Sequence, residues 1–252
     1  MYNNLVLKHI NKPHLTFDDR TSSTSSDSSC PGTPHSKIFP IPQMDLCLMN
    51  EAYSNEVFAL ISGSFFRDEP LNKCLCFELP DEPIEFTNLA IKIALQDKCS
   101  YVAIDTATQK VIAVILSVIE SKNDETNLWD GSQFKSEKVR YVLKVLKCVH
   151  DNVDLFQTFD TDLLLHIIVV TIDESYRGLR ITEKLIHSSL ERAKQVGIKA
   201  VFSEATSLYS SKAFRKLGFQ IYNEVIYSKY DKIRLSNLDE HDRCVLVATN
   251  TV

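Results

Sequence analysis

Residues 163–172 read LLLHIIVVTI, and residues 176–182 read YRGLRIT. The first run is apolar and rich in β-branched residues, which predicts a buried strand. An amphipathic helix is predicted to follow, over residues 179–196, with a short polar loop between the two. A strand that passes directly into a helix leaves the first backbone N–H groups of that helix unpaired, and these groups can bind an anion. The stretch therefore predicts a strand–loop–helix unit with a phosphate site.

The rest of the chain alternates between strand-like and helix-like patterns. Strands are predicted at 44–49, 100–105, 110–119, 199–204, 220–228 and 244–249, and helices at 51–66, 84–97, 137–149 and 210–217. Asn50 and Ser136 can cap two of these helices, Pro83 can open one, and Pro70 is expected to end the first. Helices placed between strands of a mixed sheet predict a three-layer α/β or α+β domain.

The N-terminal region has a different composition. Residues 18–36 read DDRTSSTSSDSSCPGTPHS, with few apolar side chains to bury. Such a segment cannot offset the entropy lost on ordering. We expect residues 1–37 to form a mostly disordered tail rich in Ser and Thr, and residues 38–252 to form one folded domain.

Composition narrows the classes of function. A net charge of −5 and a pI near 5.8 argue against a nucleic-acid partner, which would need a basic face. No apolar run approaches the roughly 18 residues of a membrane span, and no signal-peptide core is present. The seven scattered cysteines suggest free thiols in a reducing compartment. These features predict a cytoplasmic protein with no membrane partner.

Two motifs resemble a known family. The loop with Arg177 and Gly178, together with the later Leu217-Gly218-Phe219, resembles the acyl-CoA site of the GNAT superfamily of N-acyltransferases. Residues 65–72, FFRDEPLN, resemble a segment of its arylalkylamine N-acetyltransferase-like branch, best known from insects. The resemblance covers about residues 44–250. It implies a mixed, mostly antiparallel central sheet with helices on both faces, acetyl-CoA as the default co-substrate, and no metal.

The resemblance also implies which residues bind the co-substrate. Backbone N–H groups from Gly178 to Thr182 would hold the pyrophosphate, with Arg177 and Arg180 supplying positive charge. The full expected set is Val170, Thr171, Ile172, Arg177, Gly178, Leu179, Arg180, Ile181, Thr182 and Ser207. Arg180 and Thr182 depart from the small residues usual in the family, and the Arg180 side chain could crowd the phosphate or bind it. An ordinary connection with two exposed arginines is the alternative.

Acyl transfer to an amine needs a base, because a primary amine with a pKa of about 10 arrives protonated. By resemblance, Glu69 is this base, acting through water, while Thr206 and Ser210 supply hydroxyls for binding and thiolate release. An oxyanion donor is expected in the backbone around Ile172. The tyrosine that many relatives use as an acid is replaced by Phe214, so the acid would be Ser210 or Tyr209.

Other side chains have plainer explanations. Ser210 could be only a helix N-cap. We interpret His166 as a core or sheet-surface histidine rather than a base, and place His187 on the solvent side of its helix. Phe65, Phe66 and Tyr209 could line an aromatic pocket, although core packing explains the two phenylalanines equally well.

The sequence as a whole predicts a monomeric N-acyltransferase that uses acyl-CoA to acylate a small primary amine of the arylalkylamine type. Transfer would be direct, within a ternary complex. A second hypothesis is a non-catalytic acyl-CoA-binding or interaction protein. A third is a transferase acting on a protein lysine or N-terminus.

Overall fold

The centre of the molecule is one seven-stranded sheet in the order β1-β2-β3-β4-β5-β7-β6. A computed structural model describes residues 43–124 and 129–251. The strands are β1 (Met44–Leu48), β2 (Tyr101–Asp105), β3 (Val111–Ser121), β4 (Leu163–Ile172), β5 (Ala200–Ala205), β6 (Gln220–Ile226) and β7 (Arg243–Asn250). Neighbouring strands are antiparallel except β4 and β5, which are parallel. The predicted mixed, mostly antiparallel sheet is confirmed.

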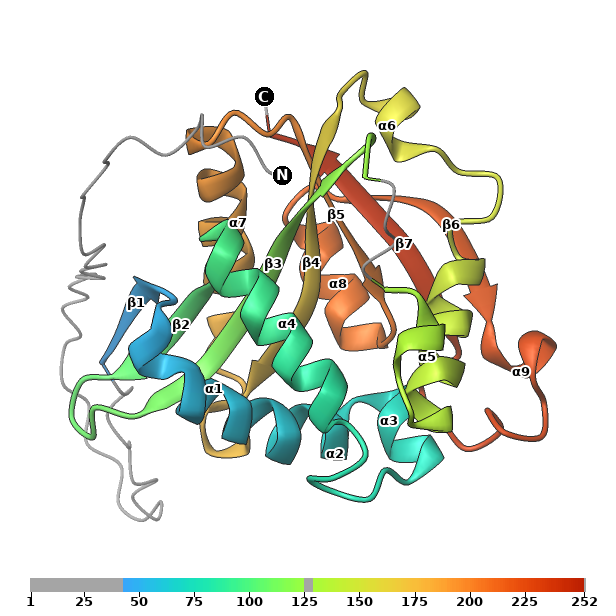
Figure 1. Ribbon diagram of the computed structural model, residues 1–252, viewed down its shortest axis with the longest axis horizontal. Coiled ribbons are helices and arrows are strands. Elements are labelled where there is room, and N and C mark those ends of the chain that lie inside the picture. The colour runs from blue at the N-terminus through green and yellow to red at the C-terminus, as the bar shows by residue number, and fades with distance from the viewer. Residues whose placement is uncertain (1–42, 125–128, 252) are drawn as a thin grey trace, which may run out of the picture.

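Helices cover both faces of this sheet (Figure 1). The α-helices are α1 (Ser54–Leu60), α2 (Phe66–Asp68), α3 (Pro70–Leu75), α4 (Ile84–Asp97), α5 (Glu137–Cys148), α6 (Leu155–Thr158), α7 (Ile181–Gln195), α8 (Leu208–Lys216) and α9 (Tyr227–Tyr230). Shorter turns are η1 (Glu51–Tyr53), η2 (Ile61–Phe65), η3 (Gly131–Gln133) and η4 (Glu174–Tyr176). Helices α1, α4 and α5 pack on one face, and α7 and α8 pack on the other.

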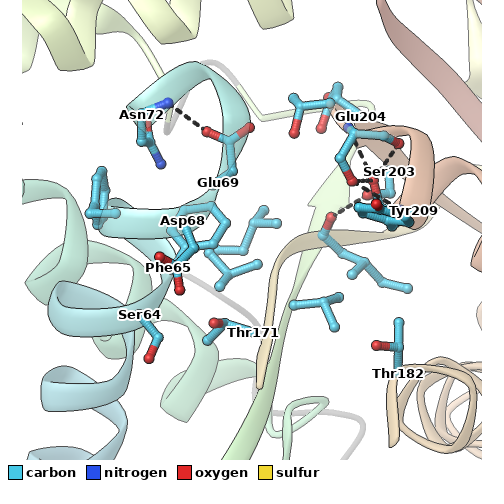
Figure 2. A pocket seen from close by; sticks show the side chains of 18 of the residues that line it. Ser64, Phe65, Asp68, Glu69, Asn72, Thr171, Thr182, Ser203, Glu204 and Tyr209 are labelled. Atoms are coloured by element: carbon cyan, nitrogen blue, oxygen red, sulfur yellow. Dashed lines mark hydrogen bonds between the residues drawn. The ribbon is translucent and has the colours of Figure 1, made fainter. Parts of the chain in front are cut away.

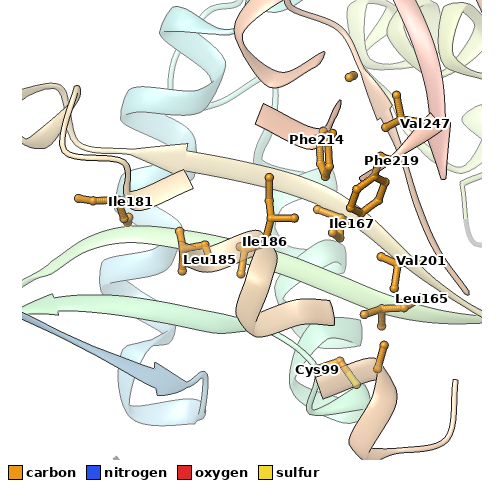
Figure 3. Close-up of a cluster of buried hydrophobic side chains, with 14 of the residues drawn as sticks. Cys99, Leu165, Ile167, Ile181, Leu185, Ile186, Val201, Phe214, Phe219 and Val247 are labelled. Carbon is orange, nitrogen blue, oxygen red and sulfur yellow. The ribbon is translucent and has the colours of Figure 1, made fainter. Parts of the chain in front are cut away.

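The core under α7 shows why the 163–197 stretch folds as it does (Figure 3). Ile181, Leu185 and Ile186 recur at helical spacing, and each is at most 1% exposed. They pack with Ile167 of β4 and Phe214 of α8 in one hydrophobic cluster. Burial of this stripe fixes the start of α7 directly beside the end of β4.

The two central strands, β4 and β5, are paired along only part of their length. β4 and β5 pair only from Leu164 to His166 on one side and from Ala200 to Phe202 on the other. Next, Ser203 Oγ donates a 2.8 Å hydrogen bond to the carbonyl of Ile167. Ile168 then has no partner in β3, since Ser117 pairs with Ile167 and Leu116 with Val169, so β4 carries a bulge there. Beyond it, β4 pairs with β3 alone, and a gap opens toward β5.

Several boundaries differ from the predictions. The helix expected over 51–66 is broken into η1, α1, the π-helical turn η2 and α2. Pro70 does end it, since Glu69 is extended, but Pro70 also opens a new helix, α3, which the sequence analysis missed. Helix α8 begins at Leu208 rather than Ser210, so the last predicted helix started two residues late. The short helices α6 and α9 were not predicted either.

Two other predictions agree with the structure, and one concerns residues that the structure does not describe. The helix over 84–97 is confirmed at both ends, and Ser136 caps α5 as expected. The predicted tail and the start of the domain near Ile38 lie outside the described residues. Within the described part, no helix is both long and apolar enough to cross a membrane.

Candidate active site

A cavity of about 640 Å³ lies at the gap between β4 and β5 (Figure 2). The segment joining α2 to α3 forms one side, and the beginning of α8 forms the opposite side. Predicted site residues that line it are Glu69, Val170, Thr171, Ile172, Arg177, Gly178, Thr182, Thr206, Ser207 and Ser210. Residues separated by up to 141 positions in the sequence are thus brought to one cavity.

Three predicted residues do not line the cavity with their side chains. Ile181 is 1% exposed and belongs to the core under α7. Leu179 packs against the same core, and Arg180 is exposed. A ligand at this loop could therefore contact Ile181 only through its backbone.

Glu69 combines a structural role with an unused oxygen. Its extended backbone caps α3, and Oε2 accepts a 2.8 Å hydrogen bond from the Asn72 N–H. Its other oxygen, Oε1, is buried and has no hydrogen-bond partner among the described residues. Burial raises the pKa of Glu69, and the nearby Thr206 hydroxyl and the Asn72 N–H oppose this rise without cancelling it. A carboxylate with a raised pKa and an unpaired oxygen, on a residue that lines a cavity, suits a general base.

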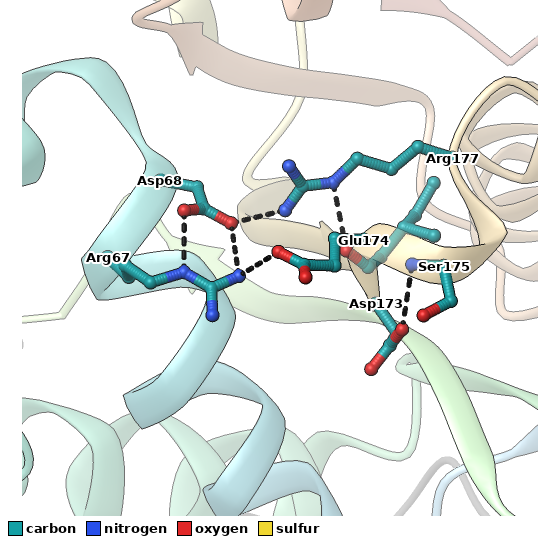
Figure 4. Close-up of polar contacts among 7 residues, drawn as sticks. Arg67, Asp68, Asp173, Glu174, Ser175 and Arg177 are labelled. Atoms are coloured by element: carbon teal, nitrogen blue, oxygen red, sulfur yellow. Dashed lines mark hydrogen bonds and ion pairs between the residues drawn. The ribbon is translucent and has the colours of Figure 1, made fainter.

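Asp68 is placed for a different task (Figure 4). Its carboxylate accepts hydrogen bonds from Arg67, at 2.7 and 2.8 Å, and also pairs with Arg177. Arg67 further bonds Glu174 at 2.8 Å. The hydrogen bonds from Arg67 and then Arg177 lower the pKa of Asp68 to about 2. Such a carboxylate is a poor proton acceptor, and the network instead ties α2 to the loop after β4.

The loop before α7 has the backbone of an anion site. Gly178 has φ +83°, and an added Cβ would meet no atom within 4 Å. Arg180 precedes the helix with φ 58° and ψ 25°, and its side chain does not cap α7. The first N–H groups of α7 are therefore not capped by the preceding side chain. Arg177 is already paired with Asp68, whereas Arg180 makes no ion pair with any described residue.

The hydroxyls at the start of α8 are engaged with one another. Ser207 is the N-cap, and Ser210 is the third helical residue of a reciprocal capping box, so Ser210 is not itself the N-cap. Their Oγ atoms lie 2.8 Å apart. Tyr209 is 64% exposed and its hydroxyl bonds Glu240, while Phe214 is 2% exposed in the core. Of the two hydroxyls predicted as the proton donor, that of Tyr209 thus bonds Glu240, whereas that of Ser210 bonds Ser207 at the wall of the cavity.

The end of the cavity lined by α2, α4 and α5 is largely apolar, and only some of its lining residues were predicted. Phe65 and Phe66 line it while also packing in the core, so both earlier explanations of these residues hold. Lining residues that were not predicted for a site include Phe77, Phe86, Val139, Val142, Leu143, Leu146 and Glu204. The four apolar residues of α5 in this set recur at helical spacing, and such spacing does not distinguish a side chain that packs in the core from one that lines a cavity.

The histidine interpretations are confirmed in position. His187 is exposed on α7 and His166 is 6% exposed. The partners of His166, which are two carboxylates, could not be foreseen because they come from β3 and β5.

No protein-family model matches the chain. Solved structures nevertheless share its fold. Arylalkylamine N-acetyltransferase 2 from Aedes aegypti is 24% identical with a TM-score of 0.76, and the match covers 83% of this chain and 99% of that one. A mosquito arylalkylamine N-acetyltransferase-like protein, 5b, is 18% identical with a TM-score of 0.70, covering 82% and 100% of the two chains. A Drosophila melanogaster polyamine N-acetyltransferase that forms N-acetylagmatine is 15% identical with a TM-score of 0.70, over 82% and 100%. The chain therefore has the fold of the GNAT acetyltransferases.

Proposed function

We propose that the protein is an acyl-CoA-dependent N-acyltransferase that acts on a small primary amine. The observation that carries this proposal is the placement of Glu69. Glu69, whose buried Oε1 has no hydrogen-bond partner among the described residues, lines the same cavity as the gap between β4 and β5 and the start of α7. A proton acceptor and an anion site thus share one cavity, which suits an amine that meets a phosphate-bearing acyl donor.

The residues around the gap fit acyl-CoA, with acetyl-CoA as the default. The pyrophosphate would lie at the start of α7, on backbone N–H groups from Gly178 to Thr182, including those of Leu179 and Ile181. Arg180 and Arg177 would add positive charge, although Arg177 is shared with Asp68. The acyl-bearing arm would then run along Val170, Thr171 and Ile172 of β4, whose gap-facing edge pairs with no strand, toward Ser207.

The transfer itself balances without a covalent enzyme intermediate. The amine nitrogen attacks the thioester carbonyl carbon, a C–N bond forms and the C–S bond breaks. Glu69 accepts the proton of the ammonium group, directly or through water, which frees the nitrogen to attack. The departing thiolate takes a proton from the Ser207–Ser210 hydroxyl pair, with Thr206 beside it, and this pair regains a proton from the nitrogen that has formed the C–N bond. A backbone N–H of the β4 edge between the bulge at Ile168 and Ile172 would stabilise the oxyanion.

The amine is proposed to be of the arylalkylamine type. Phe65, Phe66, Phe77 and Phe86 give the cavity an aromatic wall, and α5 adds aliphatic side chains. The solved structures of similar fold include enzymes of arylalkylamines and of agmatine. An apolar wall favours a small organic amine over a protein lysine, which is the weaker alternative.

We also propose a cellular location and an oligomeric state. The six described cysteines are free thiols, which suits a reducing compartment such as the cytoplasm. We propose a monomer.

The test is free-thiol release from acetyl-CoA with a panel of arylalkylamines, polyamines and amino acids. Release that depends on an amine supports the transferase. Acetyl-CoA binding without thiol release for any amine would favour the alternative, a non-catalytic acyl-CoA-binding protein.

A further inference from the structure

One tyrosine hydroxyl lies deep in the protein, behind the wall of the cavity. Tyr227 is the first residue of α9 and is only 1% exposed. Its ring belongs to a hydrophobic cluster that includes Leu71 of α3 and Leu246 of β7. A phenylalanine would fill almost the same volume, and burying a hydroxyl among apolar side chains costs free energy unless the hydroxyl is hydrogen-bonded. The choice of tyrosine is therefore explained by the hydrogen bond that its hydroxyl makes.

The partner of this hydroxyl is the backbone of Thr206. The Tyr227 hydroxyl donates a 2.8 Å hydrogen bond to the Thr206 carbonyl. Strand β5 pairs with β7 only as far as Ala205, opposite Val245, so Thr206 lies just beyond the paired part of the strand. Tyr227 is itself held in place, because its N–H donates a 3.0 Å hydrogen bond to the Asp242 carbonyl. One side chain thus fixes the backbone at the point where β5 leads into α8.

Thr206 stands between two groups of the proposed chemistry. It lines the main cavity together with Glu69 and Ser207. Burial raises the pKa of Glu69, and the Thr206 hydroxyl opposes this rise. The next residue, Ser207, caps α8, and its Oγ lies 2.8 Å from that of Ser210. A movement of the Thr206 backbone would therefore disturb the base and the hydroxyl pair together.

The other ionisable groups that face Glu69 are uncharged. Burial raises the pKa of each of them, and the charge of Glu69 adds to the rise; they are Cys74 of α3, Tyr227 of α9 and Cys244 of β7. The Thr206 hydroxyl and neighbouring backbone N–H groups are the interactions that favour the carboxylate form of Glu69. A displaced Thr206 should consequently be visible in the titration of Glu69.

We propose that Tyr227 is a positioning residue for the acyl transfer: by holding the Thr206 carbonyl, its hydroxyl keeps the Thr206 side chain beside Glu69 and the Ser207–Ser210 pair in register across the cavity. Tyr227 acts through the backbone of Thr206 and does not itself line the cavity. The inference rests on the proposed amine acylation and adds a residue that supports its base.

The test reads the titration of Glu69 by NMR of protein labelled with carboxyl-¹³C glutamate, where the Glu69 signal is assigned by its loss in Glu69→Gln. Wild type is compared with Tyr227→Phe, Thr206→Val and the double variant. Tyr230→Phe is the matched control, because Tyr230 lies in the same short helix, packs against the same cluster and is outside the main cavity. The pH dependence of kcat/KM for thiol release from acetyl-CoA is measured on the same proteins.

Tyr227→Phe should move the titration of Glu69 upward by about half a pH unit or more, since a hydrogen bond that favours the carboxylate is lost. The acid limb of kcat/KM should move with it, which lowers activity on that limb by about 3-fold. Thr206→Val should give a similar shift, Tyr227→Phe should add nothing to it in the double variant, and Tyr230→Phe should leave the titration unchanged.

A wild-type titration of Glu69 in Tyr227→Phe, an equal shift in Tyr230→Phe, or additive shifts in the double variant would overturn the proposal. If Tyr227→Phe does not fold, Thr206→Val decides: an unshifted Glu69 there would show that the hydroxyl held by Tyr227 has no effect on the base. The NMR titration needs no turnover, so a wild-type protein that releases no thiol with any amine would contradict only the transferase.

Discussion

Replacing Arg180 with glycine should stabilise the fold and weaken acyl-CoA binding at the same time. Arg180 has φ 58° and ψ 25°, a left-handed conformation that costs an L-residue about 1–2 kcal/mol. Glycine removes this strain, but its greater freedom in the unfolded chain takes back about 0.5–1 kcal/mol. We expect a net gain of about 0.5–1 kcal/mol in the free energy of unfolding, or about 1–4 °C in Tm for a chain of this size.

The effect on binding has the opposite sign. Arg180 is exposed, has no ion-pair partner among the described residues and immediately precedes α7. Arg177 is already held by Asp68, so Arg180 is the more available cation for a pyrophosphate. Losing one charge-assisted contact at an exposed site should weaken acetyl-CoA binding by about 10-fold at low salt.

Three variants separate strain from charge. Arg180→Lys keeps both, Arg180→Ala removes only the charge, and Arg180→Gly removes both. In thermal unfolding, the Arg180→Gly variant should have a higher Tm than the Arg180→Ala variant. In calorimetric titration, the affinity for acetyl-CoA should fall equally in these two variants and change little in Arg180→Lys. A glycine variant no more stable than the alanine variant would refute the strain. Undiminished binding in both would show that Arg180 does not hold the phosphate.

Two further predictions concern the loop and the buried histidine. Gly178→Pro should weaken acetyl-CoA binding by at least about 10-fold, because φ +83° is closed to proline; calorimetry checks this, and unchanged affinity would remove the loop from the site. His166 has a folded pKa of about 10 against 6.5 in the unfolded chain, so its stabilisation is complete below pH 6.5 and declines above it. The free energy of unfolding should fall by about 1.4 kcal/mol per pH unit in that window. Denaturant melts should show a flatter profile for His166→Gln, and an equal slope in both proteins would contradict a charged histidine.

The positions of the strands and of the long helices along the chain could be predicted because their periodicity is local. The apolar run at 163–172 predicted both ends of β4 correctly, and the pattern at 84–97 did the same for α4. The break at η2 and the new helix at Pro70 were missed, because a helix pattern continues across 51–66 and a proline that ends one helix can also begin the next.

The candidate site was predictable only where a motif carried it. Glu69, the 177–182 loop and Ser210 were found by resemblance, and their shared cavity depends on the gap between β4 and β5, which no local pattern reveals. Glu120, His150, His166 and Glu204 lie on separate elements, so the contacts among them follow only from the sheet order.

The most direct test of the proposed transferase is the pH dependence of kcat/KM for wild type and Glu69→Gln with the best amine of the panel. Because burial raises the pKa of Glu69, wild-type activity should have an acid limb above the ordinary glutamate value of 4.5. Glu69→Gln should lower kcat/KM by about 100-fold or more and lose this limb, while acetyl-CoA affinity barely changes and the dependence on amine ionisation remains. A Glu69→Gln enzyme with wild-type kcat/KM across the same pH range would contradict the proposal that this carboxylate accepts the amine proton.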